Sequence, residues 1–337
     1  MQTEITDFLV IGAGLAGLAF AGDAAASGAS VRLLDKGRGV GGRTATRRFG
    51  DLRVDHGAQY FTARGQRLQS LASAGLSAGW LAVWCRGLPL YKEGAIQSRP
   101  EGHPRYAPPS GMNALPKQLA QGLEVALSAT VTEITRDPAG SGWVVRCADG
   151  QTFTGHRLVL NLPPTQLLSL AADLLPTGTR TGIQNVTYAP AWTLMARLSK
   201  DVPGANWPAL EFEGHPVLGL LSRDHTKRGG ADAPPVLVAN GSGEWSRAHL
   251  EDDPASVQTA LLAAAQSVTG PLAVEEAQVH RWRYAQPTQL FEAPFFWDST
   301  TGIGGCGDWC DTGSPLHGGK VEAALESGWR LAAEAIR

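Results

Sequence analysis

Three glycines near the start of the chain could hold a phosphate group. Gly12, Gly14 and Gly17 form a G-x-G-x-x-G pattern after an apolar segment, 8–11, and before an alanine-rich segment, 18–27. Between a strand and a helix, the first glycine permits a sharp turn, the second leaves space for a pyrophosphate, and the third allows close helix packing. The N–H groups at the helix start favour anions. The pattern predicts a dinucleotide site, and the alternative is a glycine turn in an alanine-rich α/β protein.

An acidic residue follows the second expected strand. Residues 30–34 are mostly apolar and end on Asp35, where a carboxylate can accept both hydroxyls of a ribose. Gly28, just before this strand, is suited to end the preceding helix. Segment 37–43 then supplies four glycines and Arg43, which suits a long, doubly charged ligand. The alternative is a flexible, cationic surface loop.

An aromatic strand is expected near the end of the chain. His280, Trp282 and Tyr284 alternate with Arg281 and Arg283, so the three aromatic side chains share one face and the arginines share the other. Aromatic walls suit the stacking of a planar substrate against a planar cofactor. The alternative is an ordinary amphipathic strand.

A second glycine-rich stretch, 302–309, comes before a C-terminal helix expected at 320–336. Asp308 could accept hydrogen bonds from hydroxyl groups of a ligand, and the helix N-terminus could stabilise negative charge on it. Glycine turns before a terminal helix also occur for purely structural reasons.

These stretches, in this order, resemble renalase-like FAD-dependent oxidoreductases within the amine-oxidase-like flavoprotein superfamily. The G-G-R segment ending at Arg43, the D-H-G-A-Q-Y-F segment 55–61, the H-R-W-R-Y-A-Q-P segment 280–287 and Gly307-Asp308 carry the resemblance. It implies a Rossmann-like FAD-binding domain of the p-hydroxybenzoate hydroxylase or monoamine oxidase type. It also implies an α+β substrate domain built on an antiparallel sheet, with the overall class α/β.

The resemblance implies a set of site residues, the catalytic residues stay unknown, and no metal ligand is expected. His56, within segment 55–61, is by itself more often structural than catalytic. The substrate cavity, expected between the FAD domain and the sheet, would be lined by Gln59, Tyr60, His280, Trp282, Tyr284 and Trp309. Non-covalent FAD would contact Gly12, Ala13, Gly14, Leu15, Ala16, Gly17, Asp35, Lys36, Gly42, Arg43, Thr44, Gly57, Ala58, Gln59, Val131, Gly307, Asp308, Gly319 and Val321.

Composition is typical of a globular enzyme. The chain has 337 residues and a net charge of −2, which give no reason to expect a nucleic acid or anionic membrane partner. The four cysteines do not form a disulfide framework, and Cys306-x-x-x-Cys310 lacks zinc spacing, although a redox pair there is an alternative. The N-terminus lacks a basic flank, so we expect a cytoplasmic protein.

Two domains are expected. Segments 1–65, 110–165 and 295–337 would form the FAD-binding domain, and segments 66–109 and 166–294 the substrate domain. A hairpin is expected at Gly50-Asp51. Further helices are expected at 68–76, 111–123, 166–175 and 256–268, and further strands at 124–127, 130–134, 143–147, 152–153, 157–162, 192–198, 217–221 and 236–240.

The expected activity is that of a flavin oxidase. A hydride would pass from a small planar substrate to flavin N5, and O2 would take the electrons to give hydrogen peroxide. By resemblance to bacterial renalases, the substrate would be an isomeric dihydro-NAD(P) that returns to NAD(P)+. The alternatives are a flavin amine oxidase with an aromatic cage, an FAD-binding protein with little turnover, and a simple NAD-dependent dehydrogenase.

Overall fold

The contacts of the computed structural model divide the chain into two compact units. The chain passes from the first unit to the second after Gly42 and returns to the first unit twice. This division reflects packing, so the predicted division into cofactor and substrate domains stays a prediction. The structure describes residues 5–138, 140, 142–229, 233–313 and 320–337. The first unit holds Met1–Gly42, Leu115–Thr187 and Pro287–Arg337, and the second holds Arg43–Ala114 and Tyr188–Gln286.

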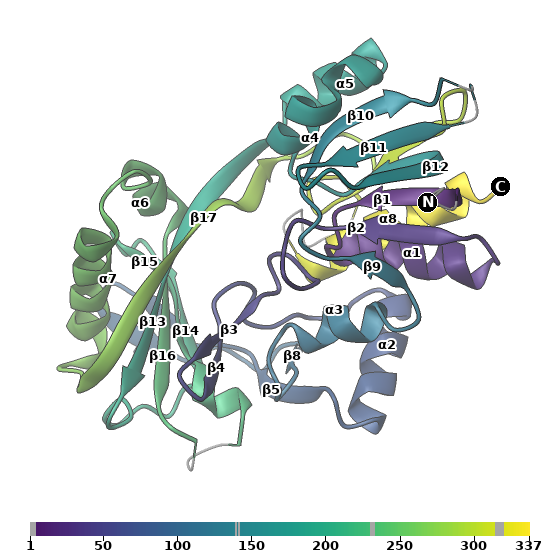
Figure 1. The fold of residues 1–337 in the computed structure, drawn as a ribbon. Helices are drawn as coiled ribbons and strands as arrows, with labels where there is room; N and C mark the ends of the chain where they lie inside the picture. Colours follow the sequence, from purple (N-terminus) through teal and green to yellow (C-terminus); the bar gives the residue numbers. More distant parts are fainter. Residues whose placement is uncertain (1–4, 139, 141, 230–232, 314–319) are drawn as a thin grey trace. The chain divides into compact units, whose positions relative to one another are not determined.

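The first unit is built on a mixed sheet of eight strands, counted over the described residues (Figure 1). Strand β1 (Thr6–Ile11) is apolar and largely buried, and it pairs in parallel with β2 (Val31–Leu34) and β12 (Thr152–Leu160). The first half of β12 pairs antiparallel with β11, and its second half pairs in parallel with β19. The other strands of this sheet are β9 (Glu124–Ala126), β10 (Val131–Arg136), β11 (Trp143–Cys147), β18 (Phe296–Asp298) and β19 (Ile303–Gly305).

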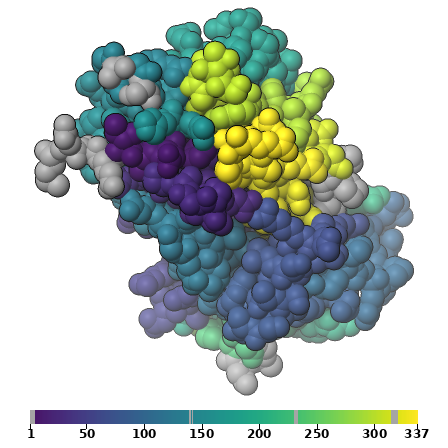
Figure 2. Space-filling view, turned by 90° about the vertical axis from the view of Figure 1, so that its right-hand side faces the viewer, coloured from purple at the N-terminus to yellow at the C-terminus, as the bar shows by residue number. Residues whose placement is uncertain are grey.

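Helices from the two ends of the described chain pack against each other in the first unit. α1 (Leu15–Ala26) and α8 (Val321–Ala335) lie side by side, as the purple and yellow segments of Figures 1 and 2 show. A Cβ atom on Gly328 of α8 would lie 2.1 Å from the carbonyl oxygen of Ala16, so the absence of a side chain permits this contact. Three shorter elements lie on the middle segment: α4 (Pro164–Ala171), the 3₁₀ turn η1 (Ala172–Leu174) and α5 (Thr177–Gln184).

The second unit contains a sheet in the order β17-β13-β16-β15-β14-β6-β7. β13 with β16, β16 with β15, β15 with β14 and β6 with β7 pair antiparallel, whereas β14 pairs with β6 in parallel. The central strands β13 and β16 are buried along most of their length, because one apolar cluster covers each face of the sheet at its centre. The strands are β6 (Leu90–Lys92), β7 (Ala95–Gln97), β13 (Thr187–Leu198), β14 (Ala209–Glu213), β15 (Leu218–Arg223), β16 (Val236–Gly241) and β17 (Val274–Gln289).

The core of the second unit lies between this sheet and α7 (Pro254–Thr269). Leu261 and Ala265 of α7 are fully buried in one apolar cluster with Leu194 and Leu237 of the sheet. Asp253 is the N-cap of this helix, and its carboxylate accepts hydrogen bonds from two backbone N–H groups. The remaining elements are β3 (Thr46–Phe49), β4 (Leu52–Asp55), α2 (Gln66–Ser77), β5 (Ala82–Arg86), β8 (Pro104–Ala107), the 3₁₀ turn η2 (Asp224–Lys227) and α6 (Gly243–Ala248).

Most of the expected elements are confirmed, including the β3–β4 hairpin, but a few are wrong in their extent. The helix expected at 111–123 is only α3 (Ala114–Leu119). Gly111 has a φ of +107°, and the N–H groups of Met112 and Asn113 donate to the side chains of Asp55 and Thr46. These side-chain bonds replace the first helical turn. The strands expected at 152–153 and 157–162 are the single strand β12, and the helix expected at 166–175 is α4 followed by η1.

Candidate functional site

The glycine turn of the first unit is packed against Asn161, the residue after β12. A Cβ atom on Gly12 would lie 2.1 Å from the carbonyl oxygen of Asn161, and one on Gly14 would lie 2.7 Å from its Oδ1. A Cβ on Gly17 would lie 2.3 Å from the carbonyl oxygen of Gly12. Gly12 also has a φ of +101°, which favours glycine. The spacing is therefore required by packing within the protein, in addition to any need for space beside a ligand.

The Asp35 carboxylate organises the loops around this turn. Its Oδ2 accepts from the N–H of Ala13 and its Oδ1 from the N–H of Gly37, each at 2.7 Å. The N–H of Gly41 donates to the carbonyl of Ala13 at 2.8 Å, so segment 35–41 folds back onto the glycine turn. A carboxylate has lone pairs left for further donors after two such bonds. The predicted contact of Asp35 with ribose stays a prediction.

The late glycine motif lies beside the same turn. β19 pairs with the end of β12, and the carbonyl of Cys306 accepts a 2.9 Å hydrogen bond from Nδ2 of Asn161. Asn161 therefore touches both glycine motifs, which are almost three hundred residues apart in the sequence. Asp308 is 6% exposed in this region. The first unit thus brings together the two motifs that the sequence assigned to opposite ends of a flavin cofactor.

The residues present fit a dinucleotide at the start of α1. Gly14 is the N-cap residue and provides no side-chain cap, so the first N–H groups of the 12-residue helix are not bonded by a capping side chain. Leu15, Ala16 and Gly17 form that first turn and have small exposed fractions. Oδ1 of Asn161 is buried beside Gly14 without a hydrogen-bond partner. Uncapped helix N–H groups and an unpartnered polar atom are what a phosphate or hydroxyl ligand would satisfy.

The other predicted cofactor residues of the first unit belong to several different elements. Lys36 donates to Oε1 of Gln166 at 3.1 Å, and Gly42 has a φ of +52° with open space at its Cβ position. Val131 is the first residue of β10, and Val321, the first residue of α8, is buried. Gly307 is buried, and a Cβ there would meet the Trp309 indole nitrogen at 2.3 Å. Gly319 lies outside the described residues.

Trp309 has an environment that differs from the cavity wall we expected. It is 1% exposed, its Nε1 donates to the carbonyl of Leu162 at 3.1 Å, and its ring packs against Phe291. These contacts favour packing in the first unit over contact with substrate. Its predicted place in the substrate cavity stays a prediction.

In the second unit, segment 55–60 packs directly on segment 43–45. The N–H of Ala58 donates to the carbonyl of Arg43 at 2.9 Å, and a Cβ on Gly57 would lie 2.0 Å from that oxygen. The Arg43 guanidinium donates to the carbonyls of Tyr284 and Ala285 on β17, each at 3.3 Å. Thr44, the next residue in the sequence after Arg43, is buried. The small residues of this segment thus allow two backbones to touch.

Gln59 is tied into a buried ionic cluster that the sequence did not reveal. Lys227, which is fully buried, donates to Oε1 of Gln59 at 3.0 Å and to Asp224 at 2.8 Å. Its Nζ lies 3.3 Å from Asp55 Oδ2, and Arg228 lies 2.7 Å from the same oxygen. Burial would raise the pKa of Asp55, but the two cations hold that pKa below its ordinary value. The side chain of Gln59 is therefore committed to the interior, and its predicted contacts with FAD and substrate stay predictions.

The predicted aromatic face of β17 is joined by His56 and Arg47. The rings of His280 and Trp282 lie 4.4 Å apart, and His56 stacks on Trp282 at 5.3 Å. Nε1 of Trp282 donates to the His56 carbonyl at 2.8 Å, and Arg47 lies 3.3 Å from Nδ1 of His280. On the other face, Arg281 and Arg283 pair with Glu251. The alternation expected from the sequence is present.

Both histidines of this face are held neutral. Burial, together with the neighbouring His280 and Arg47 side chains, lowers the pKa of His56 to about 4. Burial and Arg47 also lower the pKa of His280. Nδ1 of His56 is buried and has no hydrogen-bond partner. The face therefore offers neutral imidazoles and one guanidinium to a ligand.

Tyr284 and Tyr60 lie in separate aromatic groups of the second unit. The Tyr284 ring meets Tyr188 edge to face at 5.8 Å. The Tyr60 hydroxyl donates to Glu211 at 3.3 Å, and the Arg105 guanidinium lies 5.2 Å from the centre of the Tyr60 ring. Burial raises the pKa of Tyr60, so its hydroxyl stays protonated.

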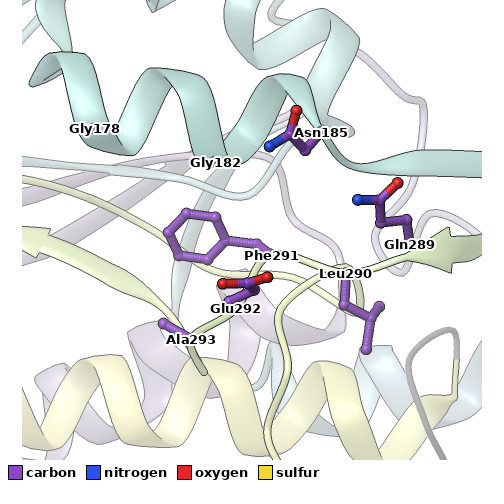
Figure 3. A pocket seen from close by; sticks show the side chains of 8 residues that line it. All are labelled: Gly178, Gly182, Asn185, Gln289, Leu290, Phe291, Glu292 and Ala293. Carbon is purple, nitrogen blue, oxygen red and sulfur yellow. The ribbon is translucent and has the colours of Figure 1, made fainter.

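A small pocket of the first unit lies outside the predicted site (Figure 3). It has a volume of about 260 Å³ and lies between α5 and the segment that follows β17. The Phe291 ring packs under Gly182, and the backbone of Phe291 is hydrogen bonded to Trp309 and Asp311. Its walls are formed by Gly178, Gly182, Asn185, Gln289, Leu290, Phe291, Glu292 and Ala293, none of which the sequence singled out.

Comparisons with known proteins identify the family. Residues 10–81 match the model of an NAD(P)-binding Rossmann-like domain, and residues 97–336 match that of flavin containing amine oxidoreductases. The second match covers most of the chain. The chain belongs to the flavin containing amine oxidoreductase family. It is therefore an FAD-dependent oxidoreductase, and the predicted fold class is confirmed.

Solved structures share this family's fold with the present oxidoreductase at low sequence identity. Putrescine oxidase bound to putrescine superimposes with a TM-score of 0.74 at 16% identity, covering 98% of this chain and 99% of that one. Cyclohexylamine oxidase from Brevibacterium oxydans IH-35A gives 0.75 at 15% identity, with 99% of both chains covered. A proposed protoporphyrinogen oxidase from Exiguobacterium sp. 255-15 gives 0.76 at 14% identity, with 99% of both covered. These likenesses establish the fold alone.

No described helix is both long enough and apolar enough to cross a membrane. No group of three or more His, Cys, Asp or Glu side chains in the described ranges could hold a metal ion.

Sequence reasoning missed Asn161, Lys227 and Arg47 in this oxidoreductase. Asn161 follows directly on an apolar strand, where the carboxyl ends of parallel strands gather, and this position was a usable signal. Lys227 lies in a charged run, 223–228, that reads as a solvated turn. Only packing shows that this run is buried.

Proposed function

We propose that this enzyme is a renalase-type oxidase that oxidises an isomeric dihydro-NAD(P) to NAD(P)+. When bound, FAD supplies the hydride acceptor at its N5 atom and passes the electrons to O2, which gives hydrogen peroxide. The start of α1 and the Asp35 loop would hold its phosphates and ribose, and Asp308 would bind its ribityl chain. The protein then has to bind and orient a donor that already carries a transferable hydride.

The single observation that carries this proposal is the charge of the aromatic face on β17. Its polar groups are the Arg47 guanidinium and the neutral imidazoles of His56 and His280. Asp55, the carboxylate that raises the pKa of His56, is itself engaged by Lys227 and Arg228. Such a face suits a neutral or anionic planar ring and disfavours a protonated amine.

A dihydropyridine also removes the need for a catalytic base. Loss of a hydride from a dihydropyridine gives an aromatic ring directly, without proton abstraction from carbon. His56 has a pKa of about 4, so it would be neutral at the working pH and could accept a hydrogen bond from an amide. Trp282 would stack on the ring, while its N–H keeps His56 in place through the 2.8 Å bond.

Family membership favours a second candidate, an amine oxidase. One structural relative holds putrescine. In this chain Trp282, Tyr284 and Tyr60 would have to form the cage around a neutral amine. The arginine beside His280 would oppose binding of the ammonium form.

Rapid-mixing reduction of the enzyme's flavin separates the candidates. We expect isomeric dihydro-NAD(P) to bleach the flavin absorbance, putrescine and cyclohexylamine to leave it unchanged, and denaturation to release the FAD. Arg47→Glu should slow reduction by dihydro-NAD(P) at least about tenfold, whereas Arg283→Glu on the opposite face should have no effect. Bleaching by amines alone would replace this proposal with the amine oxidase. Failure of every donor would leave an FAD-binding protein with little turnover.

A further inference from the structure

Lys227 is a basic residue whose side chain is fully buried in the second unit. The side chains of Lys227 and Asp55 are each 0% exposed, and that of Asp224 is 1% exposed. Its ammonium donates to Asp224 and Gln59 and lies 3.3 Å from Asp55, and the Trp84 ring lies 5.0 Å away. A buried charge without partners would strongly destabilise the fold, so the buried ammonium needs these contacts.

The cluster pairs two acidic with two basic side chains. Asp55 and Asp224 each contact Lys227 and Arg228; burial raises the pKa of Asp224, whereas the two cations hold the pKa of Asp55 low. Opposite charges in direct contact exert little field on a distant group, because their contributions largely cancel. Any influence on the chemistry must therefore act through the positions of the atoms to which the cluster is bonded.

The bonded atoms belong to segment 55–60. Lys227 donates to Oε1 of Gln59, which orients the amide so that Nε2 donates to the carbonyls of Asp55 and Gly57, at 2.5 and 3.3 Å. Asp55 in turn accepts from Thr46 at 2.6 Å and from the N–H of Met112 at 2.8 Å. The ammonium thus sits at the centre of a network that fixes this turn, in addition to the backbone contact of Ala58 with Arg43.

We propose that Lys227 is a positioning residue, which holds Gly57 and Ala58 in the conformation that the bound flavin requires by fixing the side chain of Gln59. The proposal rests on the proposed function, since it takes segment 57–59 to lie along the flavin. A buried ion pair is by itself weak evidence for stability, because apolar residues often replace such pairs without loss. Positioning of segment 57–59 therefore explains the buried lysine better than a contribution to stability does.

Two variants separate positioning from stability. Lys227→Met removes the ammonium, and Gln59→Leu removes the link to the turn but leaves both ion pairs in place. Lys227→Arg is the conservative variant, and Lys92→Met, which removes an exposed pair with Glu213, is the matched control. Each purified variant is compared with wild type for thermal unfolding, FAD affinity of the apoprotein, and the visible circular dichroism of the bound flavin.

Hydrogen exchange supplies a measurement that does not depend on bound flavin. In the apoprotein, the amides of Ala58 and Met112 should exchange about tenfold faster in both Gln59→Leu and Lys227→Met. FAD affinity should fall about tenfold, and the flavin dichroism should change. In amide exchange, FAD affinity and flavin dichroism, Lys227→Arg should lie between Lys227→Met and wild type. Lys92→Met should match wild type. The double variant should be no worse than Lys227→Met.

Each outcome bears on the proposal. If Gln59→Leu folds with wild-type exchange, FAD affinity and flavin dichroism, Lys227 is not a positioning residue. If Lys227→Met does not fold, Gln59→Leu decides the question. A wild-type protein that binds no FAD would refute the proposed function, and faster exchange in Gln59→Leu would still support the network.

Discussion

The side-chain amide of Asn161 donates a 2.9 Å hydrogen bond to the backbone carbonyl of Cys306. The same side chain lies against the glycine turn at Gly14, so one residue joins the first and last motifs of the sequence. Both contacts arise because β12 lies between β1 and β19 in the sheet, and Asn161 is the next residue after it. One asparagine therefore contacts both glycine motifs.

Asn161→Ala should destabilise the protein by about 1–3 kcal/mol, because the buried carbonyl of Cys306 loses its donor. FAD affinity should also fall, since Cys306 and Gly14 are no longer held by a common side chain. Urea unfolding and FAD titration measure the two effects. Asn185→Ala, an exposed asparagine of the same unit, is the control. Equal stability of the two variants would contradict this interpretation.

Gly328→Ala should destabilise the protein by at least about 2 kcal/mol. Its Cβ would lie 2.1 Å from the backbone oxygen of Ala16, and α1 and α8 would have to separate. Gly22→Ala is the matched substitution in α1, where nothing lies within 4 Å of the new atom. It should stabilise the protein by about 0.5–1 kcal/mol, because alanine is the better helix former. Thermal unfolding of both variants measures the two changes in stability. The prediction fails unless Gly328→Ala lowers the stability and Gly22→Ala raises it.

Stability should fall when the pH is lowered from about 6.5 to about 4. Burial and the neighbouring His280 and Arg47 side chains lower the pKa of His56 from 6.5 to about 4, so the unfolded chain binds this proton first. The loss should reach on the order of 3 kcal/mol across that window and should be complete below the folded pKa. Urea unfolding at a series of pH values measures it. His56→Asn should flatten the curve, and an unchanged slope in this variant would exclude His56 as the source.

Cys306 and Cys310 should resist alkylation in the folded protein. All four cysteines are free thiols, and burial raises the pKa of both Cys306 and Cys310. Burial also raises the pKa of Cys85 to about 11, so it should react slowly at pH 8. Mass spectrometry after iodoacetamide treatment should find four labels only in denatured protein. Joint loss of the Cys306 and Cys310 thiols on mild oxidation would support the redox pair instead.

The sequence by itself determined the two glycine motifs, the class of fold and the alternation along β17. These features depend on local spacing: a G-x-G-x-x-G turn between a strand and a helix is typical of dinucleotide-binding folds, and residues two apart in a strand share a face. The same local rules placed the helix at α7 and the hairpin at β3 and β4 within a few residues.

Tertiary structure alone decided which polar residues are buried together. The charged run at 223–228 has no period that separates a solvated turn from an ionic core, and Asp55 lies in a strand more than one hundred and fifty residues before it. The helix expected to start at Gly111 starts only at Ala114 because Asp55 and Thr46 bind the N–H groups of Met112 and Asn113, a long-range contact that propensity does not contain. Pairing of distant polar groups depends on how strands are ordered in a sheet, and that order is a property of the whole chain.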